Sequence, residues 1–308
     1  MRGLNLNIPY FDTHCDTASE IMGRYGLREN PLHLDLARGS RYAPRGQVFA
    51  CFADGGNYDD YTKQRDNLMA EFRKNRELAA FCRNGKDAEK AYKDGKTAAF
   101  ISVEGAELLD CSIEKLERAK TDDGLCIVTL TWNHANPLSG SNCDRPEEGL
   151  TCLGKAFVRA CDKFGVFVDV SHLSDKGFWD VMEITEKPVI ATHSNSRAVH
   201  KHTRNLTDDM FRAIIETGGI VGINLYGEFL GAEPDIKSVL KHVEHFLNMG
   251  GETHLAVGAD LDGCDILPAE IGGIQDMHRL YYEIENNFGK SIAENIYFNN
   301  AMTLLSRL

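Results

Sequence analysis

The sequence predicts an α/β protein folded as a closed, TIM-type (β/α)8 barrel. Eight short β-branched runs alternate with longer amphipathic segments, which implies parallel strands joined by crossover helices. The first run ends at segment 12–16 (DTHCD), without the glycine-rich phosphate loop that usually follows the first strand of an open doubly wound sheet. A length of 308 residues suits one large barrel, with two ordinary domains as the alternative.

The elements can be placed along the chain from their periodicity and their caps. Strands are predicted at 8–12, 47–53, 97–103, 125–131, 166–170, 189–192, 219–225 and 254–258. Helices are clearest at 63–81, 112–119, 153–164, 175–184, 207–216 and 238–249. Ser174 and Thr207 each precede a charged first turn, as N-cap residues do. No linker or low-complexity tract interrupts the series, so residues 1–308 are predicted to form a single barrel domain.

The composition excludes several classes of partner. The chain has 46 acidic against 34 basic side chains, and a formal net charge of −12 argues against binding to nucleic acid or to an anionic membrane. The hydrophobic share of 43% and the charged share of 26% are those of an ordinary globular protein rather than a disordered one.

Targeting signals and cysteine usage predict a cytoplasmic protein. No apolar run of signal-peptide length follows the segment 1–8, and the longest apolar stretches, 124–130 and 218–225, are far shorter than the ~20 residues of a membrane span. The nine cysteines form no CxxC pair, and in a chain of this size they are expected to be reduced thiols.

Residues that bind metals follow five of the eight predicted strands. In chain order they are His14 and Asp16 after the first strand, Glu104 after the third, His172 after the fifth, His193 after the sixth and Asp260 after the eighth. The carboxyl ends of all strands in a parallel barrel open onto one face, where the catalytic groups of such folds converge. We therefore expect these six side chains to meet.

Each of these residues alone has a simpler interpretation. A histidine at a strand end is commonly a hydrogen-bonded structural residue, and an aspartate before a helix is commonly an N-cap. Independent structural reasons would not place all six at strand ends, however. Imidazoles and carboxylates suit zinc-like ions, and two ions ~3.5–4 Å apart need a carboxylate between them, for which Glu104 is well placed.

With these residues placed, the sequence resembles the membrane dipeptidase family (renal dipeptidase-like, peptidase M19), as a bacterial member without a membrane anchor. The matching segments are 12–16 (DTHCD), 103–105 (VEG), 168–173 (VDVSHL), 188–194 (PVIATHS), 204–209 (RNLTDD) and 258–263 (GADLDG). The resemblance implies a (β/α)8 barrel with two Zn²⁺ ions, other divalent ions being an alternative, that hydrolyses small dipeptides through a hydroxide shared by the two metals.

The resemblance also implies a role for each matching residue. His14 and Asp16 would bind the first zinc, and His172 and His193 the second, with Glu104 as the bridging and catalytic carboxylate. Asp260 resembles the catalytic acid/base of the family. Arg204 resembles the arginine that holds the terminal carboxylate of the substrate, for which a guanidinium fork is well shaped. Members of the family are often dimers, so a homodimer is an expectation of the same kind.

One segment departs from the mammalian members of that family. They carry a substrate-contacting histidine directly after Leu-Thr at the end of the fourth strand, where this chain has Trp132, with His134 two residues further on. Trp132 and His134 are therefore both candidate substrate contacts, and an ordinary loop position is the alternative for His134.

The sequence is also compatible with two other functions, and it contains further histidines outside the matching segments. A barrel amidohydrolase acting on a lactam, lactone or phosphoester, or a non-catalytic metal-binding barrel, are the alternative functions. His242 and His245 are interpreted as part of a helix surface rather than as ligands, and Asp262 as a residue that shapes the loop of Asp260.

Overall fold

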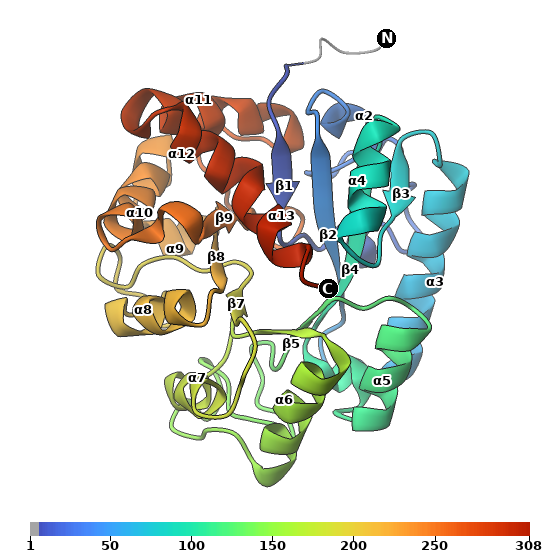
Figure 1. Ribbon diagram of the computed structural model, residues 1–308, viewed down its shortest axis with the longest axis vertical. Helices are drawn as coiled ribbons and strands as arrows, with labels where there is room; N and C mark the ends of the chain where they lie inside the picture. The colour runs from blue at the N-terminus through green and yellow to red at the C-terminus, as the bar shows by residue number, and fades with distance from the viewer. Residues whose placement is uncertain (1–5) are drawn as a thin grey trace.

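The protein folds as a closed parallel barrel, seen in a computed structural model that describes residues 6–308 (Figure 1). Its eight strands are β1 (Tyr10–Asp12), β2 (Arg45–Phe52), β4 (Thr97–Glu104), β5 (Ile127–Thr129), β6 (Phe167–Asp169), β7 (Ile190–Ala191), β8 (Ile220–Ile223) and β9 (Leu255–Val257). Each strand pairs in parallel with its neighbours, and the pairing of β2 with β4 closes the ring. The predicted (β/α)8 fold is confirmed. Residues 1–5 of the segment screened for a targeting signal lie outside the described residues.

A short ninth strand corrects the longest predicted helix. The helix expected over 63–81 is α3 (Tyr58–Lys74), and β3 (Ala79–Phe81) follows it. Asn75 ends the helix, and its side-chain amide donates to the Glu71 carbonyl. β3 then pairs with the first half of β4, while the second half of the same edge pairs with β5. The helical periodicity of the sequence continues through residues 79–81, but hydrogen bonding to the edge of β4 makes these residues a strand.

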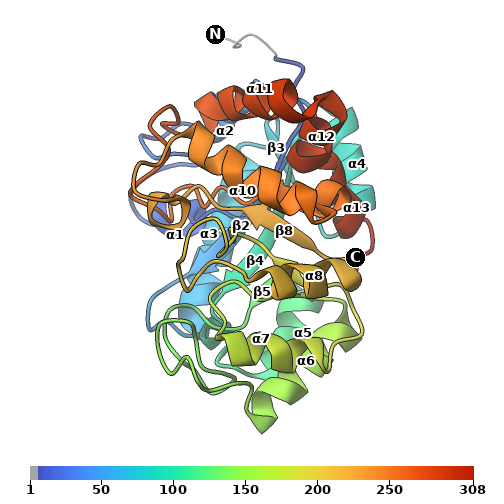
Figure 2. The same cartoon turned by 90° about the vertical axis from the view of Figure 1, so that its left-hand side faces the viewer.

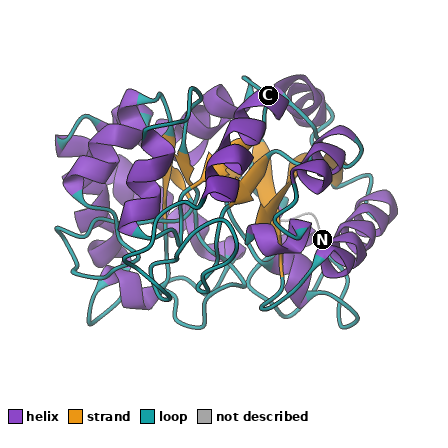
Figure 3. Cartoon of the chain, turned by 90° about the horizontal axis from the view of Figure 1, so that it is seen from below, coloured by secondary structure: helices purple, strands orange, loops and turns teal. Residues whose placement is uncertain are grey.

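Helices form the outer ring of the barrel (Figure 3). The other α-helices are α1 (Thr17–Glu20), α2 (Leu36–Gly39), α4 (Gly85–Lys93), α5 (Ile113–Thr121), α6 (Cys152–Phe164), α7 (Asp175–Met182), α8 (Asp208–Glu216), α9 (Gly227–Leu230), α10 (Ile236–Asn248), α11 (Met277–Phe288), α12 (Lys290–Glu294) and α13 (Asn300–Leu305). Short 3₁₀ turns lie at Ala106–Leu109, Gly251–Thr253 and Ile274–Asp276, and a π-helical turn lies at Asn295–Asn299.

The caps explain where several helices begin. The hydroxyls of Ser174 and Thr207 accept hydrogen bonds from backbone N–H groups in the first turns of α7 and α8, as predicted. Helix α10 lies on the outside of the barrel, with α11 on one side of it and β8 on the other (Figure 2). Among the helices of residues 6–308, none combines the length and the apolar character needed to cross a membrane.

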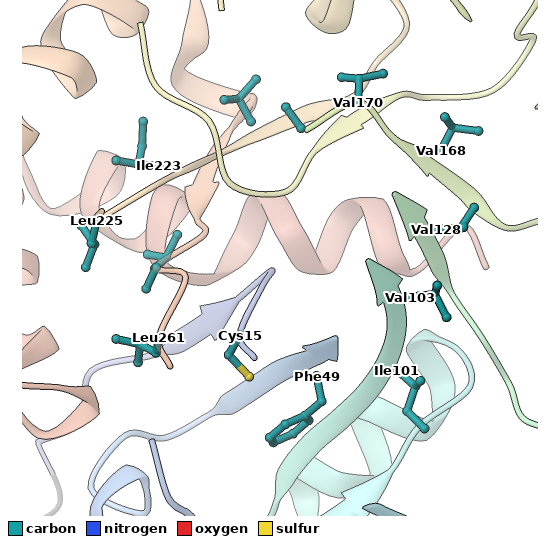
Figure 4. Close-up of a cluster of buried hydrophobic side chains, with 14 of the residues drawn as sticks. Cys15, Phe49, Ile101, Val103, Val128, Val168, Val170, Ile223, Leu225 and Leu261 are labelled. Carbon is teal, nitrogen blue, oxygen red and sulfur yellow. The ribbon is translucent and has the colours of Figure 1, made fainter. Parts of the chain in front are cut away.

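The core has two parts because neighbouring side chains of a strand point to opposite faces. The larger cluster lies between strands and helices and includes Phe49, Ile101 and Val168 (Figure 4). Phe11, next to Tyr10 of the larger cluster, belongs instead to a smaller one shared with α4 and α13. Apolar packing on both faces of the strands holds their carboxyl ends, and hence the loops that follow them, in fixed positions.

Candidate metal centre

The six side chains predicted to meet do lie together beyond the carboxyl ends of the strands. Glu104 is the last residue of β4, and the others stand in the loops directly after β1, β6, β7 and β9. All six are buried, with exposed fractions of 8% or less. Charged groups are almost never buried to this degree unless they are paired or coordinate a metal.

The first half of the cluster surrounds the imidazole of His14. Its Nε2 atom lies 3.4 Å from Oδ2 of Asp16 and 3.5 Å from Oε2 of Glu104. His14 Nε2 and Asp16 Oδ1 are buried without a hydrogen-bond partner within the described residues. Buried polar atoms of this kind normally have a partner, and a divalent cation coordinated by these three residues would supply one.

The second half of the cluster shares Glu104 with the first. The Nε2 atoms of His172 and His193 lie 2.9 and 3.5 Å from Oε1 of Glu104, and 3.0 Å from each other. Oε2 of Glu104 thus faces His14 while Oε1 faces His172 and His193. One oxygen turned toward each group is the geometry of a bridging carboxylate.

Asp260 lies at the edge of both groups. Its Oδ1 atom is 3.8 Å from Nε2 of His14. Asp260, His14 and His193 also form a group whose ligand atoms lie within 4.8 Å of one another. Asp260 is therefore within reach of both a bound ion and any water that the ion holds.

The outer nitrogens of two histidines are held by hydrogen bonds. Nδ1 of His172 lies 2.8 Å from Oδ1 of Asn133, and Nδ1 of His193 lies 2.8 Å from Oγ1 of Thr192. The Thr192 hydroxyl donates its proton to Asp169, so it accepts the hydrogen bond from His193. Both Nε2 lone pairs are then free to face the cluster, as metal-binding histidines require. The supporting roles of Asn133, Thr192 and Asp169 were not predicted from the sequence. The one signal was Asp169, a charged residue inside the apolar run of β6.

An unusual backbone conformation sets the direction of two of the six side chains, those of His172 and Asp260. His172 and Asp260 adopt positive φ angles of 68° and 59°, a region that non-glycine residues rarely occupy. Asp262 has a φ of 70°, and its carboxylate accepts hydrogen bonds from the Thr17 hydroxyl and the backbone N–H of His33, each at 2.6 Å. Asp262 therefore ties the loop of Asp260 to the segment after β1, in line with its predicted supporting position.

The electrostatics of the cluster favour a cation. Burial alone would raise the pKa of Glu104, but the imidazoles of His14 and His172 hold that pKa well below its usual range. Burial, reinforced by the Arg204 charge, lowers the pKa of His172 to about 4. Burial and the charge of His14 lower the pKa of His193 well below its usual value. Near neutral pH Glu104 is therefore ionised and His172 and His193 are neutral, the forms that bind metal. Burial opposes protonation of His14, but the carboxylates of Glu104 and Asp16 raise its pKa well above 6.5, so a metal cation at the cluster would take the place of the proton on His14.

A cavity of about 200 Å³ opens above the cluster. Glu104, His172 and Asp260 are among the residues that line it, and so are Trp132 and Arg204. Trp132 packs on another lining residue, Phe52, with ring centroids 4.8 Å apart. The structure does not bring His134 to this cavity. Its imidazole is largely exposed and lies 3.3 Å from the carboxylate of Asp54.

Arg204 is a buried cation beside the metal-ligand cluster. Only 5% of the residue is exposed, and its guanidinium lies over the ring of Phe229 at 5.3 Å. Nε and Nη2 have no hydrogen-bond partner within the described residues. An arginine in this setting is suited to an anionic group of a bound molecule.

The interpretation of His242 as a surface residue is wrong. His242 is fully buried, and its Nδ1 atom accepts a hydrogen bond from the backbone N–H of Ser196 at 3.1 Å. The opposite face of α10 carries the exposed positions, and His242 falls on the face that packs against the loop of Arg204. His245 is partly exposed and pairs with Asp208 at 2.8 Å.

The fold and the cluster together define a class of protein. A parallel barrel with buried histidine and carboxylate side chains gathered at its carboxyl end is the arrangement of a metal-dependent hydrolase. The sequence model of the membrane dipeptidases, peptidase family M19, matches residues 1–307. The chain therefore belongs to this family, and it is a metallo-dipeptidase.

Individual relatives agree with this placement. The chain is 30% identical over 240 residues to "Uncharacterized protein in pqqA 5'region" of Klebsiella pneumoniae, covering 74% of this chain and 88% of the relative. A metallo peptidase from Rhodobacter sphaeroides, solved with a phosphinate mimic of the dipeptide L-Ala-D-Ala, has a TM-score of 0.88 and 26% identity over 98% of this chain and 99% of its own. The dipeptidase AC, a metallo peptidase of family M19, has a TM-score of 0.85 and 26% identity over 98% of both chains.

Proposed function

We propose that the protein is a zinc-dependent dipeptidase with a binuclear metal site. The observation that carries the proposal is the position of Glu104, which turns one carboxylate oxygen to each of two groups of buried ligands. His14 and Asp16 would hold one ion, and His172 and His193 the other, with Glu104 between them. The mixed imidazole and carboxylate donors suit Zn²⁺, with other divalent ions as alternatives.

When bound, the two ions would supply Lewis acidity and would lower the pKa of a water molecule toward neutrality. Asp260 takes the proton of that water and delivers it to the amine that leaves when the peptide bond breaks. Burial raises the pKa of Asp260 above its usual value, which brings it closer to the range where a group can both accept and release a proton. The 3.8 Å between Oδ1 of Asp260 and Nε2 of His14 supports this role.

Arg204 positions the substrate rather than acting on its peptide bond. Its unpaired guanidinium lines the cavity, and the terminal carboxylate of a dipeptide would complete its hydrogen bonds. Trp132, which lines the same cavity, would pack against a substrate side chain, whereas His134 is left outside this proposal. A volume of about 200 Å³ suits a small dipeptide. The dipeptide mimic bound by the Rhodobacter sphaeroides relative supports the same substrate class.

The setting of the enzyme is part of the proposal. A single catalytic domain over residues 1–308 is supported by candidate ligands that follow strands spread from β1 to β9 of one closed barrel. All nine cysteines are free thiols, seven of them buried, which supports a reducing compartment such as the cytoplasm. The homodimer stays a prediction.

Metal analysis combined with a dipeptide panel tests the proposal. The purified protein is expected to hold two equivalents of zinc and to hydrolyse dipeptides, and a chelator should abolish turnover, which added zinc restores. The matched control is Glu104→Ala, which removes the shared ligand and should prevent binding of the pair. Wild-type protein with no metal and no turnover on any dipeptide would overturn the proposal.

A further inference from the structure

Asn224 is a fully buried residue that directly follows β8 and contacts Asp260. Its Nδ2 group lies 3.1 Å from Oδ2 of Asp260. The other end of the amide fixes its orientation, because Oδ1 accepts a hydrogen bond from the backbone N–H of Tyr226 at 2.6 Å. The NH₂ group must therefore face Asp260, toward which it can only donate.

Asn195 holds Asn224 in place from the neighbouring strand. Asn195 is also fully buried and stands just after His193, beyond the end of β7. Its side-chain amide donates to the carbonyl of Asn224 at 2.9 Å and accepts from the backbone N–H of Asn224 at 3.1 Å. These two bonds fix the backbone of Asn224, and with it the amide that reaches Asp260.

The two carboxylate oxygens of Asp260 consequently have different surroundings. Oδ2 accepts the amide of Asn224, and a proton on Oδ2 would turn that contact into a clash of two donors. Oδ1 is the oxygen on the side of the metal-ligand cluster, 3.8 Å from Nε2 of His14. A proton taken up by Asp260 therefore belongs on Oδ1.

We propose that Asn224 is a positioning residue for the hydrolysis, which orients Asp260 so that Oδ1 carries the transferred proton, and that Asn195 supports it. This inference rests on the proposed acid/base role of Asp260. The Asn224 amide also reaches the backbone carbonyl of His193 at 3.4 Å, but it contacts no imidazole of the metal-ligand cluster and does not line the substrate cavity. It should therefore affect the chemical step and leave substrate affinity and metal content unchanged.

The test uses the zinc-loaded Asn224→Ala enzyme with a dipeptide substrate. Loss of a hydrogen bond to a charged group predicts a fall in kcat of about 10- to 100-fold, with KM and the zinc content close to wild type. The matched control is Asn205→Ala. Asn205 is an equally buried asparagine next to Arg204, whose amide donates to the carbonyl of Phe229 rather than to Asp260. That variant should raise KM instead.

A double-mutant cycle separates positioning from general structural support. In an Asp260→Ala background, Asn224→Ala should cause little further loss, because the group through which it acts is gone. Asn205→Ala, which acts through KM, should lower kcat/KM by the same factor in the wild-type and in the Asp260→Ala background. Where turnover by Asp260→Ala is too slow to measure, the kcat and KM pattern of the two single asparagine variants decides the question.

The outcomes distinguish this inference from the function on which it rests. Wild-type turnover by Asp260→Ala would overturn the acid/base role and this inference with it. An inactive Asp260→Ala combined with wild-type kcat for Asn224→Ala, or with losses that multiply in the double variant, overturns only the inference. If Asn224→Ala does not fold, Asn195→Ala replaces it, with a smaller fall in kcat expected and wild-type kcat as the contradicting result.

Discussion

At the scale of single residues, the enzyme buries an arginine whose guanidinium contacts the ring of Phe229 but is only partly hydrogen-bonded. Arg204 has only 5% of its surface exposed, and two of its nitrogens lack a hydrogen bond within residues 6–308. An unpaired buried charge destabilises a fold, and apolar replacements of similar size are often neutral or stabilising. Arg204 is thus a position where stability is given up so that the cavity can hold an anionic group.

Replacing Arg204 should separate binding from stability. Arg204→Met should reduce kcat/KM for dipeptides by about 10- to 100-fold, because a charge-assisted hydrogen bond to the substrate carboxylate is lost. Dipeptide amides, which lack that carboxylate, should lose little, and the melting temperature should not fall. Steady-state kinetics on paired acid and amide substrates check this, with exposed Arg212→Met as control. Equal losses on both substrates would favour an amidohydrolase that acts on uncharged substrates.

The buried His242 predicts a dependence of stability on pH. Burial, with smaller effects from His200 and His245, lowers its pKa from the usual 6.5 to about 4. Between those values the unfolded chain binds a proton that the folded protein does not, so stability falls as the pH drops from 6.5 to 4. The loss attributable to this group is roughly 3 kcal/mol.

Chemical denaturation between pH 7 and pH 4 measures the effect of His242. His242→Asn keeps an acceptor for the N–H of Ser196 but cannot be protonated, so its stability should fall less steeply than that of the wild type. His245→Asn, on the same helix but partly exposed, should follow the wild type. Parallel curves for the wild type and His242→Asn would contradict the prediction.

The site residues that could be predicted from the sequence are those with both a metal-binding side chain and a position at the end of a predicted strand. A histidine or an acid at the end of an apolar strand is unusual, and six such positions in one alternating pattern point to one site. Asn133, Thr192 and Asn224 carry no such signal, since polar residues after strands are ordinary. Their value comes only from which ligand each one touches, and that depends on the register and curvature of the closed barrel.

At the scale of elements, two glycines let three strands meet directly beneath the metal-ligand cluster. A Cβ atom on Gly222 of β8, or on Gly258 just after β9, would lie 1.9 Å from the carbonyl oxygen of Thr192. The hydroxyl of Thr13 donates to the same carbonyl at 2.6 Å. The missing side chains thus allow the loop after β1 and the ends of β7, β8 and β9 to converge at the distance that the cluster needs.

Adding one methyl group at this point should disturb both fold and site. Gly258→Ala should destabilise the protein by about 1–3 kcal/mol or more, because the new Cβ must push backbone apart, and it should weaken metal binding. Gly26→Ala is the matched control, since its Cβ would meet only Glu71 at an ordinary 3.4 Å. Thermal unfolding and zinc content check both variants. Equal melting temperatures and equal zinc contents for the two would contradict the account.

The order of the elements was predictable, but their exact extents were not. Alternating periods of two and 3.6 residues mark eight strands and the helices between them. β3 was missed because its three residues continue the apolar pattern of α3, and only pairing with β4 makes them a strand. Helices α11 and α13 were also missed; α13 packs against β1 and β8, which lie far away in the sequence, whereas α11 packs mainly against its sequence neighbours α10 and α12.

At the scale of the whole molecule, the metal site joins distant parts of one barrel. Its candidate ligands follow β1, β4, β6 and β7, with Asp260 after β9 at their edge. The unfolded chain has no such site, so metal binding adds to the stability of the folded state.

Removing the metal should therefore lower the melting temperature of the whole protein. A metal present at about 100 times its Kd stabilises by about 2.7 kcal/mol, which corresponds to a shift of about 4 °C for a protein of this size. Differential scanning calorimetry with and without chelator measures it. Glu104→Ala, which lacks the shared ligand, should show a much smaller shift. An unchanged melting temperature for chelated wild type would contradict the coupling of metal binding to folding.

The scatter of these ligands along the chain also sets an order of events during synthesis. His14 and Asp16 leave the ribosome early, yet Glu104 follows only after some ninety more residues, and His193 completes the candidate ligand set after about ninety further ones. A segment that stops before β7 can therefore offer isolated histidines and acids but not the full set of candidate ligands. Metal binding therefore belongs to the folded barrel, in which strands far apart in the sequence have already come together.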